Sequence, residues 1–242
     1  MFDTVARAAL SPLLIAQALH VRRSAQSLPE AAGPRSGTAG TGPALRLAII
    51  GDSSAAGVGV TNQDNALSGQ LVQQLAQNFT VSWHLDALTG ATTRSTLARL
   101  AEAPARPFDV IVTALGVNDV TRLIPAKSWV RQQRGLFDRL NTLYHPKQIY
   151  ISGMPPMAHF PLLPHPLRWT LGRHADKLER QRATYLATRQ DCTHMPFDLP
   201  LDPALVASDG FHPAAPLYTL WAKEIASRIL SDWPQFNLKR TA

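Results

Sequence analysis

Residues 45–54 read LRLAIIGDSS, and this stretch decides the fold. Its first six residues form a short, mostly apolar run, which is typical of a strand buried inside a parallel sheet. Gly51 then ends the strand and permits a tight turn. The polar residues Asp52, Ser53 and Ser54 follow at once. In α/β sheets, ligands bind at this point, just beyond the carboxyl ends of the strands.

The rest of the chain repeats the alternation of strand and helix. Further strands are predicted at 81–88, 110–115 and 148–152. Helices are predicted at 66–79, about 92–100, 129–144, 169–189 and 213–230, with Thr92 or Thr93 as a cap and Pro213 in the first turn of the last one. Because strands alternate with helices, we predict one α/β domain built from parallel βαβ units.

Three further polar blocks accompany the first one. They are TGA at 89–91, GVND at 116–119 and DGFHP at 209–213. The first two directly follow predicted strands, so the parallel sheet brings them to the same edge as residues 51–54. Together the four blocks supply a hydroxyl nucleophile, an imidazole base, a carboxylate to orient it and donors for an oxyanion. This set of groups predicts acyl transfer.

The blocks assign a role to each residue type. Ser53 or Ser54 supplies the hydroxyl, and the turn geometry that would distinguish them is not encoded locally. His212 is the candidate base, and Asp209, three residues earlier with Gly210 between them, is placed to orient it. Taken singly, the serine also fits a helix cap, and the Asp–His pair also fits a capping loop beside a surface histidine.

Three groups suit a developing oxyanion. They are the side-chain amide of Asn118 and the backbone N–H groups of Gly90 and Ser53. Taken alone, the GVND block also fits a simple Asn/Asp turn after a strand. Asp119 is interpreted as structural, because a carboxylate aimed at an oxyanion would repel the developing charge.

With these residues in place, the chain resembles the SGNH hydrolases, also called the GDSL-type esterase/lipase family. The resemblance covers about residues 45–230. The family's serine, glycine, asparagine and histidine blocks, and the aspartate three residues before the histidine, match Ser53, Gly90, Asn118, His212 and Asp209. One position departs from the pattern: the first block ends in Ser54 where the name-giving motif has leucine, and this position takes no part in the chemistry.

The resemblance implies a three-layer, flavodoxin-like α/β/α sandwich with a mostly parallel sheet. It also implies hydrolysis of esters or thioesters through an acyl-serine intermediate, with Ser53 as nucleophile and with no metal or cofactor. The expected division is a hydrolase domain at 45–242, preceded by an amino-terminal segment at 1–44. Competing signatures (GxSxG, HExxH, a P-loop and GxGxxG) are absent from the sequence.

The substrate is expected to contact residues 154–173, which follow the fourth predicted strand. This segment is rich in apolar residues and forms either a flap over an acyl pocket or an irregular segment packed on the core. Met154, Met157 and Phe160 are the candidate substrate contacts. A flap favours small, aromatic or lipid-like acyl esters. A carbohydrate O-deacetylase and a non-catalytic protein at a membrane surface are the alternatives.

The amino terminus differs from the rest. Residues 8–21 read AALSPLLIAQALHV, which is shorter than the roughly 20 residues that span a bilayer. The run is a helix docked on the protein, an interfacial membrane helix or a degenerate anchor, so residues 1–23 are a candidate peripheral membrane contact. Asp3 precedes the run and Arg22 and Arg23 follow it, the reverse of a signal peptide, which favours a cytoplasmic or membrane-associated protein over a secreted one. Residues 24–44 are rich in Gly, Pro, Ser and Ala, which predicts a linker or an extended arm that is either disordered or wrapped on the domain.

Composition narrows the remaining classes. The chain has 242 residues and a formal net charge of +7, but its arginines are scattered and form no basic run in the domain. We therefore expect a small-molecule ester as partner and no nucleic acid. Cys192 is the only cysteine, which excludes an internal disulfide and a cysteine-rich metal site.

Overall fold

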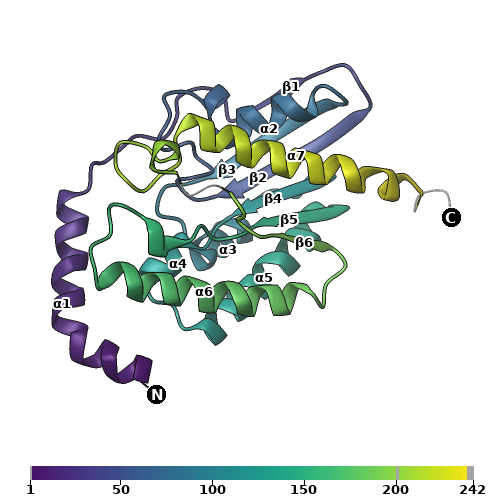
Figure 1. Cartoon of the computed structure of the whole chain (residues 1–242). Helices are drawn as coiled ribbons and strands as arrows, with labels where there is room; N and C mark the ends of the chain where they lie inside the picture. Colours follow the sequence, from purple (N-terminus) through teal and green to yellow (C-terminus); the bar gives the residue numbers. More distant parts are fainter. Residues whose placement is uncertain (1, 200–201, 239–242) are drawn as a thin grey trace.

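The computed structural model describes residues 2–199 and 202–238, and at its centre is a six-stranded sheet (Figure 1). The strands are β1 (Ser36–Ala39), β2 (Ala44–Gly51), β3 (Thr80–Ala87), β4 (Val110–Ala114), β5 (Gln148–Ser152) and β6 (Cys192–Met195). Their order across the sheet is β1-β3-β2-β4-β5-β6. β1 runs antiparallel to β3, and the remaining neighbours pair in parallel.

The four predicted strands are confirmed as β2, β3, β4 and β5, with ends that shift by one residue at most. Every residue of β4 and β5 is buried, because helices cover both faces of the sheet at its centre. The sequence pattern did not predict β1 and β6. Both are four-residue strands at the two edges of the sheet, where small or mixed side chains give no clear apolar run.

Helices cover both faces of the sheet and complete three layers (Figure 1). The helices are α1 (Phe2–Ser24), α2 (Leu67–Leu75), α3 (Thr93–Ala101), α4 (Val117–Thr121), α5 (Ala126–Tyr144), α6 (Leu167–Leu186) and α7 (Ala215–Leu238). In β2, Leu45, Leu47 and Ile49 pack under α2 and α7. Ala48 and Ile50 alternate with them and pack under α3 and α5. This two-sided burial explains why the strand sequence is apolar on both faces.

Two helix starts show how local signals act. α3 begins after Thr92, whose side chain accepts from the N–H of Ser95 while the Ser95 hydroxyl accepts from Thr92, a complete capping box. Thr92 rather than Thr93 is therefore the cap. α7 begins at Ala215, so the prediction that Pro213 occupies its first turn is wrong. Pro213 instead pairs with Val206 in an isolated bridge just before the helix.

α1 lies beside the amino-terminal end of α6 (Figure 1). The Gln17 side chain donates to the carbonyl of His165 at 2.6 Å and accepts from the N–H of Leu167 at 3.0 Å. Leu14 and Val21 pack on an apolar cluster formed by α4, α5, α6 and the segment between β5 and α6. One side of α1 is therefore docked on the protein. No helix in the described ranges is both long enough and apolar enough to cross a membrane.

The other side of α1 is uncovered. Leu13, Ile15 and Leu19 have exposed fractions of 47%, 60% and 46%. Arg22 and Arg23, in the last turn of α1, are also exposed.

The segment between α1 and β2 packs against the domain as an extended arm. The N–H of Ala32 donates to Thr61, and the N–H of Gln63 donates back to Ala32. Farther along, the arm forms β1 and joins the edge of the sheet. The sheet thus includes residues that precede the domain start expected at residue 45.

Candidate active site

The turns after β2, β3 and β4 meet at the carboxyl edge of the sheet, as the parallel strand order predicts. Gly51 ends β2 beside Ala114, the last residue of β4. A Cβ on Gly51 would lie 2.7 Å from the Ala114 carbonyl oxygen and 2.4 Å from the Ala55 Cβ, so only glycine fits. The N–H of Asp52 donates to that same carbonyl at 3.1 Å. This close packing fixes the direction in which Ser53 leaves the strand.

Ser53, His212 and Asp209 form a continuous chain of hydrogen bonds. The Ser53 Oγ lies 2.8 Å from His212 Nε2, and His212 Nδ1 lies 2.5 Å from Asp209 Oδ2. Since a carboxylate accepts hydrogen bonds, its position at Nδ1 places the imidazole proton there. Nε2 is then free to accept the proton of the Ser53 hydroxyl. The structure thus brings together the three residues that the sequence proposed as nucleophile, base and orienting acid.

A tight turn holds Asp209 in place. Its Oδ1 accepts from the N–H groups of Phe211 and His212, both at 3.0 Å. Gly210 supplies the positive φ of 68° that this turn requires. Burial alone would raise the pKa of Asp209, but the hydrogen bonds from His212 and Phe211 outweigh it and lower that pKa. Asp209 is therefore held ionised beside the imidazole.

Ser54 points into a different network. Its hydroxyl donates to Asp52 Oδ1 at 2.8 Å, and its N–H donates to the same oxygen at 3.0 Å. The structure thereby distinguishes the two serines, because only Ser53 reaches His212. Asp52 is almost completely buried, and burial raises its pKa to about 6.

Asn118 is oriented by two acceptors that flank the other loops of the site. Its Nδ2 donates to the carbonyl of Ala91 at 3.0 Å and to Asp52 Oδ2 at 3.3 Å. Ala91 is the neighbour of Gly90, and Asp52 is the neighbour of Ser53. The Asn118 amide therefore lies where the turns after β2, β3 and β4 converge.

Gly90 adopts a positive φ, a backbone conformation that favours glycine. Its φ is 79°, and a Cβ built on it would have no atom within 4 Å. Within the described part of the chain, the N–H groups of Gly90 and Ser53 donate to no protein acceptor. These two N–H groups are available to an anion at the site, whereas both hydrogens of the Asn118 amide already lie on protein acceptors.

Residues 49–220 match the model of the GDSL-like lipase/acylhydrolase family. The chain belongs to this family. The match spans more than half of the chain and includes all the residues of the hydrogen-bonded chain described above. The protein is thus a GDSL-type serine hydrolase, as its sequence blocks predicted. The match begins after α1, the arm and β1.

Solved structures with a similar fold confirm the α/β/α architecture. TesA is 18% identical, with a TM-score of 0.61, and the alignment covers 76% of this chain and 97% of that one. The psychrotrophic esterase EstA from Pseudoalteromonas sp. is 16% identical, with a TM-score of 0.59 and coverage of 78% and 98%. Axe2, an acetylxylan esterase from Geobacillus stearothermophilus, is 17% identical, with a TM-score of 0.54 and coverage of 78% and 95%. No curated protein sequence matches the chain.

In this GDSL-type hydrolase, Asp119 has the contacts of a structural residue. It is fully buried, and its Oδ2 accepts from the N–H and the hydroxyl of Thr93 at 3.0 and 2.9 Å. The Thr93 hydroxyl in turn accepts from Trp129 and Gln133 of α5. Burial raises the pKa of Asp119. This network joins α3, α4 and α5 behind the site and leaves Asn118 to face it.

An open cavity lies beside the Ser53 turn, and its walls include Asp52 and Ser54 but not Ser53 or His212 themselves. Met154 and Phe160, which the sequence proposed as substrate contacts, lie on its mostly apolar wall. Met157 does not. The 3₁₀ turn Met157–His159 buries this side chain completely in the apolar cluster under α6, so the prediction of a substrate contact there is wrong.

Sequence reasoning missed most of the cavity wall. The further apolar residues on it include Leu115, Val117, Phe197, Leu205, Leu217 and Trp221. Two of them directly follow β4, so the rule that ligand sites lie beyond strand ends would have found them. The others come from the region after β6 and from α7, and no local pattern marks them.

The described residues contain no group of three or more His, Cys, Asp or Glu side chains arranged to hold a metal ion. The acids and imidazoles near the site are instead committed to one another or to backbone N–H groups. The arrangement suits proton transfer and anion stabilisation by protein groups.

Proposed function

We propose that this GDSL-type hydrolase cleaves carboxylic esters or thioesters through an acyl-serine intermediate on Ser53. The observation that carries the proposal is the continuous chain Ser53–His212–Asp209, with bonds of 2.8 and 2.5 Å. The Ser53 Oγ attacks the carbonyl carbon while its proton moves to His212 Nε2. His212 then protonates the leaving oxygen or sulfur as the bond to the acyl carbon breaks. Water, deprotonated by His212, releases the acid from Ser53.

Asp209 and the three N–H donors act on different charges in this scheme. Asp209 orients the imidazole and stabilises the imidazolium that forms after proton transfer. The N–H groups of Ser53 and Gly90 stabilise the negative charge on the tetrahedral intermediate, and the Asn118 Nδ2 joins them by exchanging its long bond of 3.3 Å to Asp52 for the oxyanion. The two backbone N–H groups support this role, since neither of them donates to a protein acceptor in the described part of the chain.

For the substrate, we propose small, aromatic or lipid-like acyl esters. The cavity beside the Ser53 turn has mostly apolar walls, which suit the hydrocarbon part of an acyl group. The segment after β5 also contacts the histidine loop: the N–H of Leu162 donates to the Gly210 carbonyl at 3.2 Å, and Phe160 packs edge-on against Phe211. An acyl group on Ser53 would therefore meet this segment.

A carbohydrate O-deacetylase is the second candidate. It is favoured by the structural likeness to an acetylxylan esterase. An acetyl group, however, would leave most of the cavity without contacts, and the apolar wall offers few hydrogen bonds to a sugar. A non-catalytic protein at a membrane surface is a third candidate, and it predicts no turnover that depends on Ser53.

An acyl-chain series separates these candidates. Purified protein is assayed on p-nitrophenyl esters from acetyl to palmitoyl, with Ser53→Ala and Ser54→Ala as paired variants. We expect turnover to rise from acetyl towards medium chains, and to be lost in Ser53→Ala but retained in Ser54→Ala. Turnover confined to the acetyl ester would favour the deacetylase. Equal rates for wild type and Ser53→Ala would overturn the assignment of the nucleophile.

We also propose that α1 contacts an anionic lipid surface. The exposed Leu13, Ile15 and Leu19 offer apolar area, and the exposed Arg22 and Arg23 offer positive charge in a chain of net charge +7. Sedimentation with vesicles containing phosphatidylglycerol tests this. Binding that survives replacement of the three apolar residues by serine would contradict it.

A further inference from the structure

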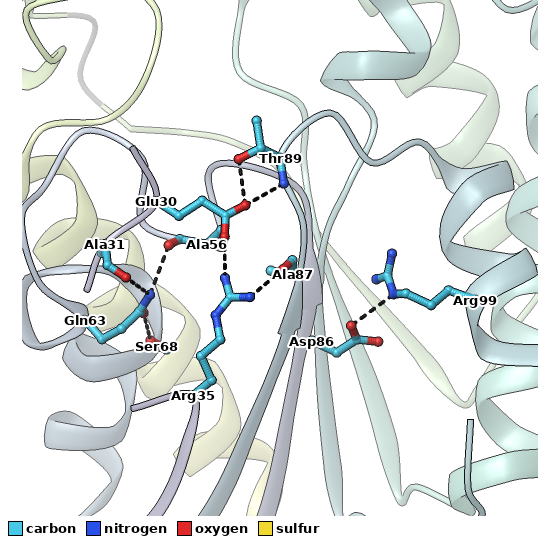
Figure 2. A network of polar contacts seen from close by, with 10 residues as sticks. All are labelled: Glu30, Ala31, Arg35, Ala56, Gln63, Ser68, Asp86, Ala87, Thr89 and Arg99. Atoms are coloured by element: carbon cyan, nitrogen blue, oxygen red, sulfur yellow. Dashed lines mark hydrogen bonds and ion pairs between the residues drawn. The ribbon is translucent and has the colours of Figure 1, made fainter. Parts of the chain in front are cut away.

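The arm, residues 25–43, runs along the two loops that carry Ser53 and Gly90. Figure 2 shows its contacts with Ala56 of the first loop, made through Gln63, and with Thr89 of the second. The arm lies outside the family match, which begins at residue 49. We infer that Glu30 of this arm is a positioning residue that holds the loop donating the Gly90 N–H to the oxyanion. This inference rests on the proposed acyl-transfer function.

Glu30 contacts the loop directly before Gly90. Its Oε1 accepts from both the N–H and the hydroxyl of Thr89, each at 2.7 Å. Its Oε2 accepts from Arg35 Nη2 at 2.9 Å, and Arg35 Nη1 donates to the carbonyl of Ala87 at 3.0 Å. Figure 2 shows this bridge from Thr89 through Glu30 and Arg35 to Ala87. The two ends of the turn after β3 are therefore tied to the arm.

The loop depends on such contacts because little else covers it. Leu88 is 53% exposed, and no atom lies within 4 Å of a Cβ built on Gly90. The N–H of Leu88 donates to Gly51 at 3.3 Å, and Arg122 donates to the Gly90 carbonyl at 3.2 Å. At the far end of the loop, the N–H of Ala91 donates to Leu88 and the Ala91 carbonyl accepts from Asn118, both at 3.0 Å. Glu30 thus holds Thr89 at two points, and Thr89 directly precedes the Gly90 N–H.

The arm itself is anchored on the nucleophile loop. The N–H of Ala31 donates to the Ala56 carbonyl at 3.2 Å. The buried Gln63 side chain donates to the carbonyls of both Ala31 and Ala56, at 3.1 and 3.0 Å, and accepts from Ser68 (Figure 2). Ala56 lies three residues after Ser53 in the chain. The arm therefore connects the two loops: Glu30 holds the loop of the Gly90 N–H, and Ala31 is bonded to the loop of Ser53.

The charge of Glu30 is compensated where it lies. A bare carboxylate close to the oxyanion donors would oppose the negative charge that develops there. The ion pair with Arg35 offsets it, so the carboxylate can hold the loop at a reduced electrostatic cost. The effect we assign to Glu30 is consequently one of geometry.

The test compares Glu30→Ala and Glu30→Gln with wild type on p-nitrophenyl acetate, measuring kcat and KM separately. A donor moved by a fraction of an ångström weakens transition-state binding more than substrate binding, so we expect kcat of Glu30→Ala to fall about 10- to 100-fold with KM changed about twofold or less. Glu30→Gln keeps an oxygen that accepts from Thr89 and should recover part of kcat. The affinity of an alkylboronic acid, whose adduct with Ser53 mimics the tetrahedral intermediate, should fall by the same factor as kcat.

The matched control is Asp86→Ala. Asp86 pairs with Arg99 at 3.1 Å, and both side chains are about as exposed as Glu30 and Arg35 (Figure 2). Asp86 lies on β3, just before the loop, but makes no hydrogen bond to residues 88–91. We expect Asp86→Ala to change thermal stability as Glu30→Ala does, while its kcat and its boronic acid affinity stay at wild-type values.

The outcomes are separable. Three results would each overturn the role of Glu30. They are a wild-type kcat in Glu30→Ala, an equal loss of kcat in Asp86→Ala, and a loss of kcat in Glu30→Ala without a loss of boronic acid affinity. A wild-type protein with no turnover dependent on Ser53 would overturn the proposed function and this inference together.

Discussion

The two halves of the active site are built in different ways. The half that moves protons consists of Ser53, His212 and Asp209, which contact one another through side-chain atoms at 2.5–2.8 Å. All three lie inside the family match. The geometry of this half is set by short polar contacts within one small cluster, and the Asp209 side chain is only 3% exposed.

The half that stabilises the oxyanion is assembled from separate supports. The Gly90 N–H comes from an exposed loop that Glu30 ties to the arm, and the Asn118 amide is oriented by Asp52 and the Ala91 carbonyl. The half that moves protons therefore depends on the chemical identity of its residues, and the half that stabilises the oxyanion depends on the placement of its donors. Substitutions in the first half should therefore abolish turnover, and those in the second should give graded losses.

Asp209→Asn is expected to have the largest effect. An asparagine amide facing Nδ1 would donate a hydrogen bond there and force the imidazole proton onto Nε2, which then cannot accept the Ser53 proton. By analogy with other Ser-His-Asp sites, kcat/KM on p-nitrophenyl acetate should fall about 10³- to 10⁴-fold. The melting temperature serves as control, because the asparagine oxygen can still accept from Phe211 and His212. A variant that keeps a tenth of the activity would contradict the proton-moving role.

Asn118→Ala tests the second half. Loss of one oxyanion donor costs about 10²- to 10³-fold in kcat in enzymes of this type. We expect a loss in this range with little change in KM, measured on the same ester. If Asn118 only orients the Asp52 and Ala91 loops, kcat and KM would change together and by less than the loss expected for Glu30→Ala.

Asp52 joins the two halves, and its ionisation supplies a pH test. Burial raises its pKa to about 6. Because the folded protein then binds this proton more tightly than the unfolded chain, Asp52 favours the fold at low pH, and this stability is lost as pH rises from about 4 through about 6. Between pH 4.5 and 7.5 the free energy of unfolding of wild type should fall by about 2 kcal/mol relative to Asp52→Asn. Urea unfolding of both proteins across this range measures the change. A difference in free energy of unfolding that stays constant with pH would show that folding does not raise the pKa of Asp52.

The difference between the two halves also decides what could be predicted from the sequence. The residues of the proton-moving half stand in blocks directly beyond strand ends or on a short turn, so spacing and residue type found Asp209 and His212 and narrowed the nucleophile to Ser53 or Ser54. The central strands were predictable for a related reason. Burial on both faces leaves a run of apolar residues, as at Val110–Ala114, whereas the edge strand Ser36–Ala39 consists of small residues and shows no such run.

The supports of the oxyanion half left no such signal. Glu30 and Thr89 are 59 positions apart, and nothing in either neighbourhood indicates that a glycine-rich arm returns to the site. The error at Met157 has a similar cause. Met154 and Met157 are equally apolar, and a single 3₁₀ turn decides which of them lines the cavity and which is buried in the core.

Deletion of residues 1–23 should have the smallest effect and sharpens the contrast between α1 and the arm. α1 touches the domain through Gln17 and a few apolar side chains, and none of its described bonds reaches the turns around Ser53 or Gly90. Turnover of p-nitrophenyl acetate should therefore change about twofold or less, since no interaction of the transition state is removed. Vesicle binding should be lost in the same protein. A collapse of folding would instead show that α1 belongs to the core, and it would place both amino-terminal segments among the supports of the site.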